Sequence, residues 1–171
     1  MEFLFWLAFG VVFYTYLGYP LLLRLLLSLS NRTEPRPPPQ LDTQGGPEVT
    51  FVVAAYNEKD WLGAKVQNCL EQDYPRDKVR YLFVTDGSDD GSPEWLRNLE
   101  LPPDFRFEVA HHPERRGKKA AIERVFPSIH TPVVVFSDAN AMLNPQAVRR
   151  LARHFLRPEV GAVAGEKRVR G

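Results

Sequence analysis

The amino-acid sequence predicts an α/β fold with a mainly parallel sheet, preceded by one N-terminal transmembrane helix. From residue 49 onward, short apolar runs alternate with helical patterns, which is typical of βαβ units. The run 133–135 is all valine and enters an acidic turn, as expected for a strand buried on both faces. The stretch Phe3–Leu23 contains no charged residue and is long enough for a helix to cross a membrane.

The segment 1–29 is interpreted as a membrane anchor. At about 1.5 Å per residue, a helix over Phe3–Leu23 spans a hydrocarbon core about 30 Å thick. Trp6 lies near one end of this stretch and Tyr19 near the other, where aromatic rings suit the membrane interface. We therefore expect membrane lipid to surround this segment.

Basic residues after the span predict its orientation. Arg24, Arg32 and Arg36 follow it, so the positive-inside rule places the rest of the chain in the cytoplasm, at an inner or plasma membrane. A cleaved signal peptide is an alternative, but Glu2 replaces the usual basic start and residues 28–30 form a poor cleavage site. A buried helix of a soluble domain is a second alternative, which the uniformly apolar composition disfavours.

Residues 30–48 are predicted to be a linker, because Arg36–Pro39 favours an extended chain and Gly45–Pro47 breaks regular structure. The remaining segment, 49–171, has room for one domain. The net charge of +1 predicts no broad basic surface, so we expect no nucleic-acid partner. The single cysteine, Cys69, excludes an internal disulfide and fits a small apolar position on a helix.

Within this domain, the pattern predicts five strands with helices between them. The strands are expected at 49–54, 79–84, 105–110, 133–137 and 160–164. The helices are expected to begin near Asn57 or Asp60, at Ser92–Pro93, at Gly117 and at Asn144–Pro145.

The turns after the first, second and fourth strands hold the candidate ligand-binding residues, at Ala54–Glu58, Asp86–Ser88 and Asp138–Asn140. In open α/β sheets, ligands bind beyond the carboxyl ends of the strands, so these turns are expected to share one crevice. Asp138 and Asn140 offer a carboxylate and an amide oxygen that suit a hard divalent cation held mainly by phosphates. The alternative is that Asp138 only caps a turn.

A basic cluster, Arg115–Lys119, opens the helix that precedes the fourth strand. A helix N-terminus with lysine and arginine attracts anions, whereas a solvated run of charge is the alternative. Combined with the ring of Tyr56 and the carboxylates of Asp86 and Asp138, this cluster suits a nucleotide diphosphate with its metal.

Four motifs together resemble the first half of a family 2 glycosyltransferase. They are VVAAYNE at 52–58, VTDGSDDGS at 84–92, RRGKKAAIE at 115–123 and VVVFSDAN at 133–140. The resemblance implies a GT-A fold, whose Rossmann-like sheet binds a nucleotide sugar, of which this chain holds an incomplete part. The segment YLGYPLLL at 16–23 resembles the N-terminal anchor of the family's membrane members, including those that build polysaccharides.

The resemblance also implies residue roles. Ala54, Tyr56 and Glu58 would line the nucleotide pocket, with Tyr56 near a uracil ring. Asp86 would accept a hydrogen bond from the imide N–H of uracil, and Lys118, with Lys119 as the alternative, would lie near the diphosphate. Asp138 and Asn140 occupy the DxD position of the family and would bind the metal, Mg²⁺ or Mn²⁺. Asn140 departs from the motif because it carries no charge.

The implied reaction is inverting transfer of a sugar, from a UDP sugar, to a glycan or a lipid-linked acceptor. The base that deprotonates the acceptor is expected beyond Gly171, and Glu166 is too close to the DxD position to serve. The chain is therefore expected to be a fragment of a longer enzyme. A nucleotide-sugar-binding module without catalysis is the alternative; a nucleotidyltransferase is disfavoured because no Gly-rich basic motif follows the first strand.

Overall fold

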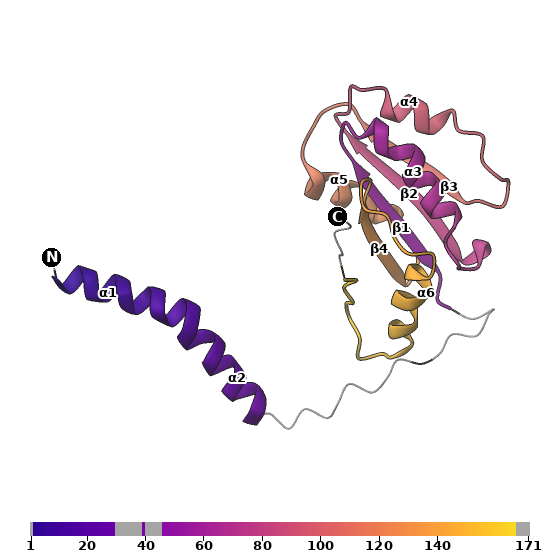
Figure 1. Cartoon of the computed structure of the whole chain (residues 1–171). Helices are drawn as coiled ribbons and strands as arrows, with labels where there is room; N and C mark the ends of the chain where they lie inside the picture. Colours follow the sequence, from indigo (N-terminus) through magenta and orange to yellow (C-terminus); the bar gives the residue numbers. More distant parts are fainter. Residues whose placement is uncertain (1, 30–38, 40–45, 167–171) are drawn as a thin grey trace. The chain divides into compact units, whose positions relative to one another are not determined.

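The computed structural model describes residues 2–29, 39 and 46–166 (Figure 1). The chain divides into two compact units, Met1–Pro37 and Pro38–Gly171, which are described separately. Most of the predicted linker lies outside the described residues, and so do Arg32 and Arg36, on which the expected orientation partly depends.

The N-terminal unit is a continuous helical segment made of α1 (Glu2–Phe13), the π-helical turn η1 (Tyr14–Gly18) and α2 (Tyr19–Leu29). The π-helical turn lies close before Pro20, whose ring would clash with the carbonyl four residues earlier in a regular α-helix. The whole segment, Glu2–Leu29, is apolar and long enough to cross a membrane. No side chain of this segment is buried within the unit, which fits a helix that contacts an apolar solvent.

The C-terminal unit contains a four-stranded parallel sheet in the order β3-β2-β1-β4. The strands are β1 (Val49–Ala55), β2 (Val79–Asp86), β3 (Phe107–His112) and β4 (Val133–Asp138). The α/β class and the parallel sheet predicted from the sequence are confirmed. Because all pairs are parallel, the carboxyl ends meet at one edge: Ala54 lies opposite Val84 on one side and Asp138 on the other.

Helices cover both faces of this sheet (Figure 1). They are α3 (Lys59–Leu70), α4 (Ser92–Arg97), α5 (Lys118–Val125) and α6 (Ala147–Ala152), with the short 3-10 segments η2 (Arg76–Lys78), η3 (Phe126–Ser128) and η4 (Arg153–Leu156).

Two apolar clusters pack the helices onto the sheet. One joins alternate residues of the strands, such as Phe51 and Phe83, to Leu62 of α3, Leu96 of α4 and Val148 of α6. The other cluster, on the opposite face, joins Val52, Leu82 and Val84 to Ala121 and Val125 of α5. This alternation along β1 and β2 explains why their sequences are apolar throughout.

The structure corrects three expectations. The fifth strand predicted at 160–164 is wrong: this segment is irregular and mostly exposed, and it pairs with no strand of the sheet in the described part of the chain. The third strand begins at Phe107, two residues later than expected. The start of α3 is capped neither by Asn57 nor by Asp60, because Asp90 Oδ2 accepts the N–H of Lys59 at 3.0 Å.

Candidate functional site

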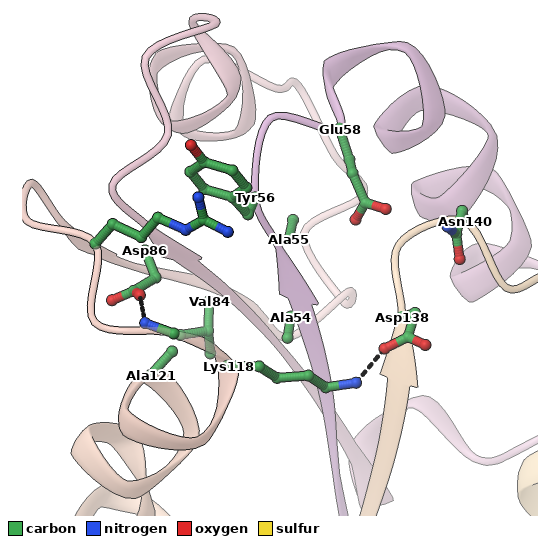
Figure 2. Close-up of a pocket in the computed structure, with 12 residues that line it drawn as sticks. Ala54, Ala55, Tyr56, Glu58, Val84, Asp86, Lys118, Ala121, Asp138 and Asn140 are labelled. Carbon is green, nitrogen blue, oxygen red and sulfur yellow. Dashed lines mark hydrogen bonds and ion pairs between the residues drawn. The ribbon is translucent and has the colours of Figure 1, made fainter.

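A pocket of about 380 Å³ opens at the carboxyl edge of the sheet (Figure 2). All seven residues predicted to bind nucleotide or metal line it, namely Ala54, Tyr56, Glu58, Asp86, Lys118, Asp138 and Asn140. Five further residues complete the lining, namely Ala55, Val84, Arg115, Gly117 and Ala121. Its volume falls within the range of small-molecule sites in proteins, which runs from about 300 to 1,000 Å³.

The parallel strands explain why distant residues meet here. Tyr56 and Glu58 follow β1, whereas Asp86 and Asp138 are the last residues of β2 and β4. Lys118 is the first residue of α5, which packs on the sheet through Ala121 and Val125. The roles that the family resemblance implies for these residues remain predictions.

Asp86 forms a rigid, charged end of the pocket. Its side chain is buried, and Oδ2 accepts the N–H groups of Arg116 and Gly117 at 2.7 Å each. Oδ1 accepts a hydrogen bond from the Arg124 guanidinium at 2.5 Å. Burial raises the pKa of Asp86, but these three hydrogen bonds and the charge of Arg124 outweigh it, so the pKa lies below its ordinary value.

Gly87 lets the loop before α5 approach this carboxylate. Its φ is +68°, and a Cβ at this position would lie 2.7 Å from the backbone nitrogen of Arg115. Gly87 N–H donates to the carbonyl of His112 at 2.8 Å, which joins the loop after β2 to the end of β3. A side chain at Gly87 would therefore displace the two N–H groups that hold Asp86.

Tyr56 and Arg115 form a flat surface beside Asp86. The guanidinium carbon of Arg115 lies 3.9 Å from the centroid of the Tyr56 ring, a cation–π contact. The ring itself is 39% exposed, so it keeps surface available to a ligand. Aromatic and guanidinium planes of this kind stack on nucleobases.

The other end of the pocket holds exposed charge. Lys118 Nζ forms an ion pair with Asp138 Oδ1, and more than 40% of each side chain is exposed. Figure 2 places Glu58 and Asn140 near this pair, away from Asp86. Burial raises the pKa of Glu58, the charge of Asp138 raises it further, and the charge of Lys118 lowers it.

The oxygen atoms at this end suit a divalent cation. Asp138 and Glu58 offer carboxylates and Asn140 offers an amide oxygen, which are hard ligands of the kind that Mg²⁺ and Mn²⁺ bind. Within residues 2–29, 39 and 46–166, no group of three or more His, Cys, Asp or Glu side chains could hold a metal ion. A cation at this end would need further ligands from water and phosphate.

A pair of reciprocal hydrogen bonds links the loops after β1 and β2. Asn57 Nδ2 donates to Asp89 Oδ1 at 2.7 Å, and the Asp89 N–H donates to Asn57 Oδ1 at 3.1 Å. The Asn57 N–H also donates to Ser88 Oγ at 3.2 Å. Asn57 adopts a positive φ of 50°, which asparagine tolerates better than most residues.

Sequence reasoning missed this link, the stacking of Arg115 on Tyr56 and the pairing of Arg124 with Asp86. The partners of these contacts are separated by 31 or more residues, so no local pattern identifies them. The available signal for these contacts was the basic character of Arg115 and Arg124. Arg115 lies just before α5, and Arg124 lies on α5, the helix next to Asp86.

Comparison with known proteins identifies similar sequences. The model of the family described as Glycosyl transferase family 2 matches residues 50–171. A poly-beta-1,6-N-acetyl-D-glucosamine synthase of Staphylococcus aureus strain MSSA476 is 28% identical over 123 residues, covering 71% of this chain and 29% of the relative. A beta-monoglucosyldiacylglycerol synthase of Synechocystis sp. is 30% identical over 148 residues, covering 84% and 31%. The chain thus spans about a third or less of the length of these relatives.

Two solved structures share the fold. A mannosyltransferase from Pyrobaculum calidifontis, in complex with GDP-Man and Mn²⁺, superposes with a TM-score of 0.77 at 32% identity, covering 92% of this chain and 46% of its own. TarS residues 1–349 of S. aureus superposes with a TM-score of 0.50 at 19% identity, covering 60% and 30%, which shows the fold alone.

Proposed function

The chain belongs to glycosyl transferase family 2, and we propose that it forms the donor-binding part of a membrane-anchored, inverting glycosyltransferase that uses a UDP sugar. One observation carries this proposal. The seven residues that the family resemblance implies for nucleotide and metal binding line a single pocket of suitable size.

The base of the nucleotide is assigned to the end of the pocket that contains Asp86 and Tyr56. The depressed pKa of Asp86 keeps its carboxylate ionised at neutral pH, ready to accept the imide N–H of uracil. The exposed part of the Tyr56 ring gives the base a surface on which to stack. The Pyrobaculum mannosyltransferase is in complex with GDP-Man, and a comparison of uridine with guanosine nucleotides tests the choice of base in this chain.

The diphosphate is assigned to the opposite end. Lys118 lies at the N-terminus of α5, where its ammonium group and the helix dipole both favour anions. Asp138 and Asn140, with Glu58 beside them, would hold Mg²⁺ or Mn²⁺. The cation would stabilise the charge that develops on the departing nucleoside diphosphate. Lys118 pairs with the carboxylate of Asp138, and its exposed side chain can turn to a phosphate oxygen.

Deprotonation of the acceptor is assigned to a carboxylate outside this pocket. Asp86 is held at the proposed base end by Arg124 and two N–H groups, and Glu58 and Asp138 lie at the proposed diphosphate end. A base in an inverting transfer has to approach the sugar from the face opposite the leaving group. We propose a glycan or lipid-linked acceptor, because the curated relatives include a polysaccharide synthase and a glycolipid synthase.

The segment Glu2–Leu29 is assigned as a membrane span with the pocket on the cytoplasmic side. Its length and apolar composition support this assignment. Protease protection of the chain in inverted membrane vesicles tests it: residues 49–166 should be digested without detergent.

Calorimetric titration of the 171-residue chain tests the donor assignment. UDP sugars should bind with Mn²⁺ present and lose most of their affinity in EDTA. The variant Asp104→Ala is a matched control, because Asp104 pairs with Arg76, and neither residue lines the pocket. Absence of binding to every nucleotide sugar, in the chain and in a form extended to the length of its relatives, would refute the proposal.

A non-catalytic nucleotide-sugar-binding module is the second candidate. The neutral Asn140, where the DxD motif has a carboxylate, favours it because it weakens the cation site. This candidate predicts donor binding without any transfer or hydrolysis of the sugar by the extended form.

A further inference from the structure

Lys65 is a fully buried lysine on α3, outside the pocket. Its ammonium group lies 5.3 Å from the centroid of the Phe51 ring, against the apolar cluster between α3 and the sheet. Burying a cation is unfavourable unless hydrogen bonds compensate for lost water. A lysine in this position therefore needs an explanation in terms of what it contacts.

The contacts of Lys65 bracket the two proposed metal ligands. Its Nζ donates to Ser137 Oγ at 2.7 Å and to the carbonyl of Ala141 at 2.6 Å. Ser137 directly precedes Asp138, and Ala141 directly follows Asn140. The turn between them is closed by a hydrogen bond of 3.2 Å from the Ala141 N–H to the carbonyl of Asp138. One ammonium group thus ties together both ends of the segment that faces the pocket.

One turn later on α3, the neutral side chain of Asn68 bonds the backbone of the loop that follows the 137–141 turn. Asn68 Nδ2 donates to the carbonyl of Leu143 at 2.7 Å, and the Leu143 N–H donates to Asn68 Oδ1 at 2.8 Å. These bonds attach the following loop to α3 but do not touch the 137–141 turn. Asn68 therefore provides an internal control for the contacts of Lys65.

We propose that Lys65 is a positioning residue, which fixes the 137–141 turn so that Asp138 and Asn140 are presented together to a divalent cation. This inference rests on the proposed function of the pocket. The charge matters because carbonyl and hydroxyl oxygens bind an ammonium more strongly than a neutral donor. Lys65 does not itself face the ligand.

The test compares Lys65→Met and Asn68→Ala with the unchanged 171-residue chain. Methionine keeps the apolar stem and removes the desolvation cost of the buried charge, but it also removes the donor to Ser137 and Ala141. These two effects oppose each other, so we expect only a small change in Tm for Lys65→Met, with faster amide hydrogen exchange over residues 138–141. In the presence of UDP, its Mn²⁺ affinity should fall about 10- to 100-fold, as for other residues that orient metal ligands.

Two readouts separate positioning from general stability. Binding of UDP in EDTA should stay within about twofold in Lys65→Met, because the fold and the Asp86 end are intact. Asn68→Ala should lower the Tm, since it leaves the Leu143 backbone groups unpaired, while Mn²⁺ affinity changes little. Unchanged exchange at 138–141 together with unchanged Mn²⁺ affinity in Lys65→Met would overturn the proposal.

Failure of the proposed function gives a different result. If the unchanged chain binds no Mn²⁺ with or without UDP, the metal role of the pocket is wrong. Faster exchange at 138–141 in Lys65→Met would then still show that Lys65 holds the turn.

Discussion

The two ends of the pocket differ in how firmly their carboxylates are held. Asp86 is buried and accepts three hydrogen bonds from the segment 116–124, whereas Asp138 has one exposed ion pair with Lys118. Buried, fully bonded groups keep one geometry, while an exposed ion pair exchanges partners at little cost. In the proposed function, the Asp86 end would therefore be preorganised for the base, and the Asp138 end would be the one that adjusts to the ligand.

The largest effect is expected at the free end. Asp138→Ala should abolish the metal-dependent part of UDP-sugar binding, because Asp138 is the charged member of the proposed cation pair. Calorimetry with Mn²⁺ and with EDTA measures this part directly. Equal affinities of the unchanged chain in Mn²⁺ and EDTA would remove the contrast between the two ends.

A large effect on both stability and binding is expected at the fixed end. Asp86→Ala leaves Arg124 and two N–H groups without their acceptor, and should cost about 2–4 kcal/mol of unfolding free energy in urea. Titration should show that uridine nucleotides lose more affinity than guanosine nucleotides. An equal loss for both bases would mean that Asp86 supports the loop and does not read the base.

The pH dependence of stability sharpens the same contrast. Because the folded pKa of Asp86 is depressed, its stabilising contribution is complete above the ordinary value, near 4, and is lost as the pH falls through the folded pKa. Asp86→Asn should therefore flatten the decline in Tm below about pH 4. No shift in this decline would show that the hydrogen bonds at Asp86 do not favour its charged form.

The smallest effect is expected for the stacked pair. Arg115→Ala removes the cation that holds the Tyr56 ring and one planar group of the proposed base surface. If the lost contact with the base is similar in strength to an exposed cation–π contact, about 0.5–1 kcal/mol, UDP affinity should fall about two- to fivefold. Arg115→Lys distinguishes charge from planarity, because lysine keeps the charge without a flat surface. If Arg115→Ala lost more UDP affinity than Asp86→Ala, the main contact with the base would be assigned to the stacked pair and not to Asp86.

Much of the fold and of the pocket could be predicted from the sequence, for a physical reason. Strands buried on both faces leave continuous apolar runs, and parallel pairing brings their ends, including Asp86 and Asp138, to one edge. The prediction of a fifth strand was wrong because a β-strand needs a neighbouring strand to pair with. The apolar run 160–164 pairs with none in the described part of the chain.

Contacts between segments distant in sequence could not be predicted. The acceptor that caps α3 comes from Asp90, and the partner of Asp86 comes from Arg124. Lys65 shows the same limit, because a lysine in an amphipathic helix is normally expected on the solvated face. Only the folded arrangement of the strands and α3 reveals that its charge lies beneath the site.

The link between Asn57 and Asp89 has a kinetic consequence. Together with the bonds at Asp86 and Lys65, it joins every backbone segment around the pocket to a neighbour. The parts left to adjust are exposed side chains such as that of Lys118, whose rotamers interconvert in picoseconds to nanoseconds. If these segments stay joined as the ligand enters, the association rate of the 171-residue chain should depend linearly on ligand concentration.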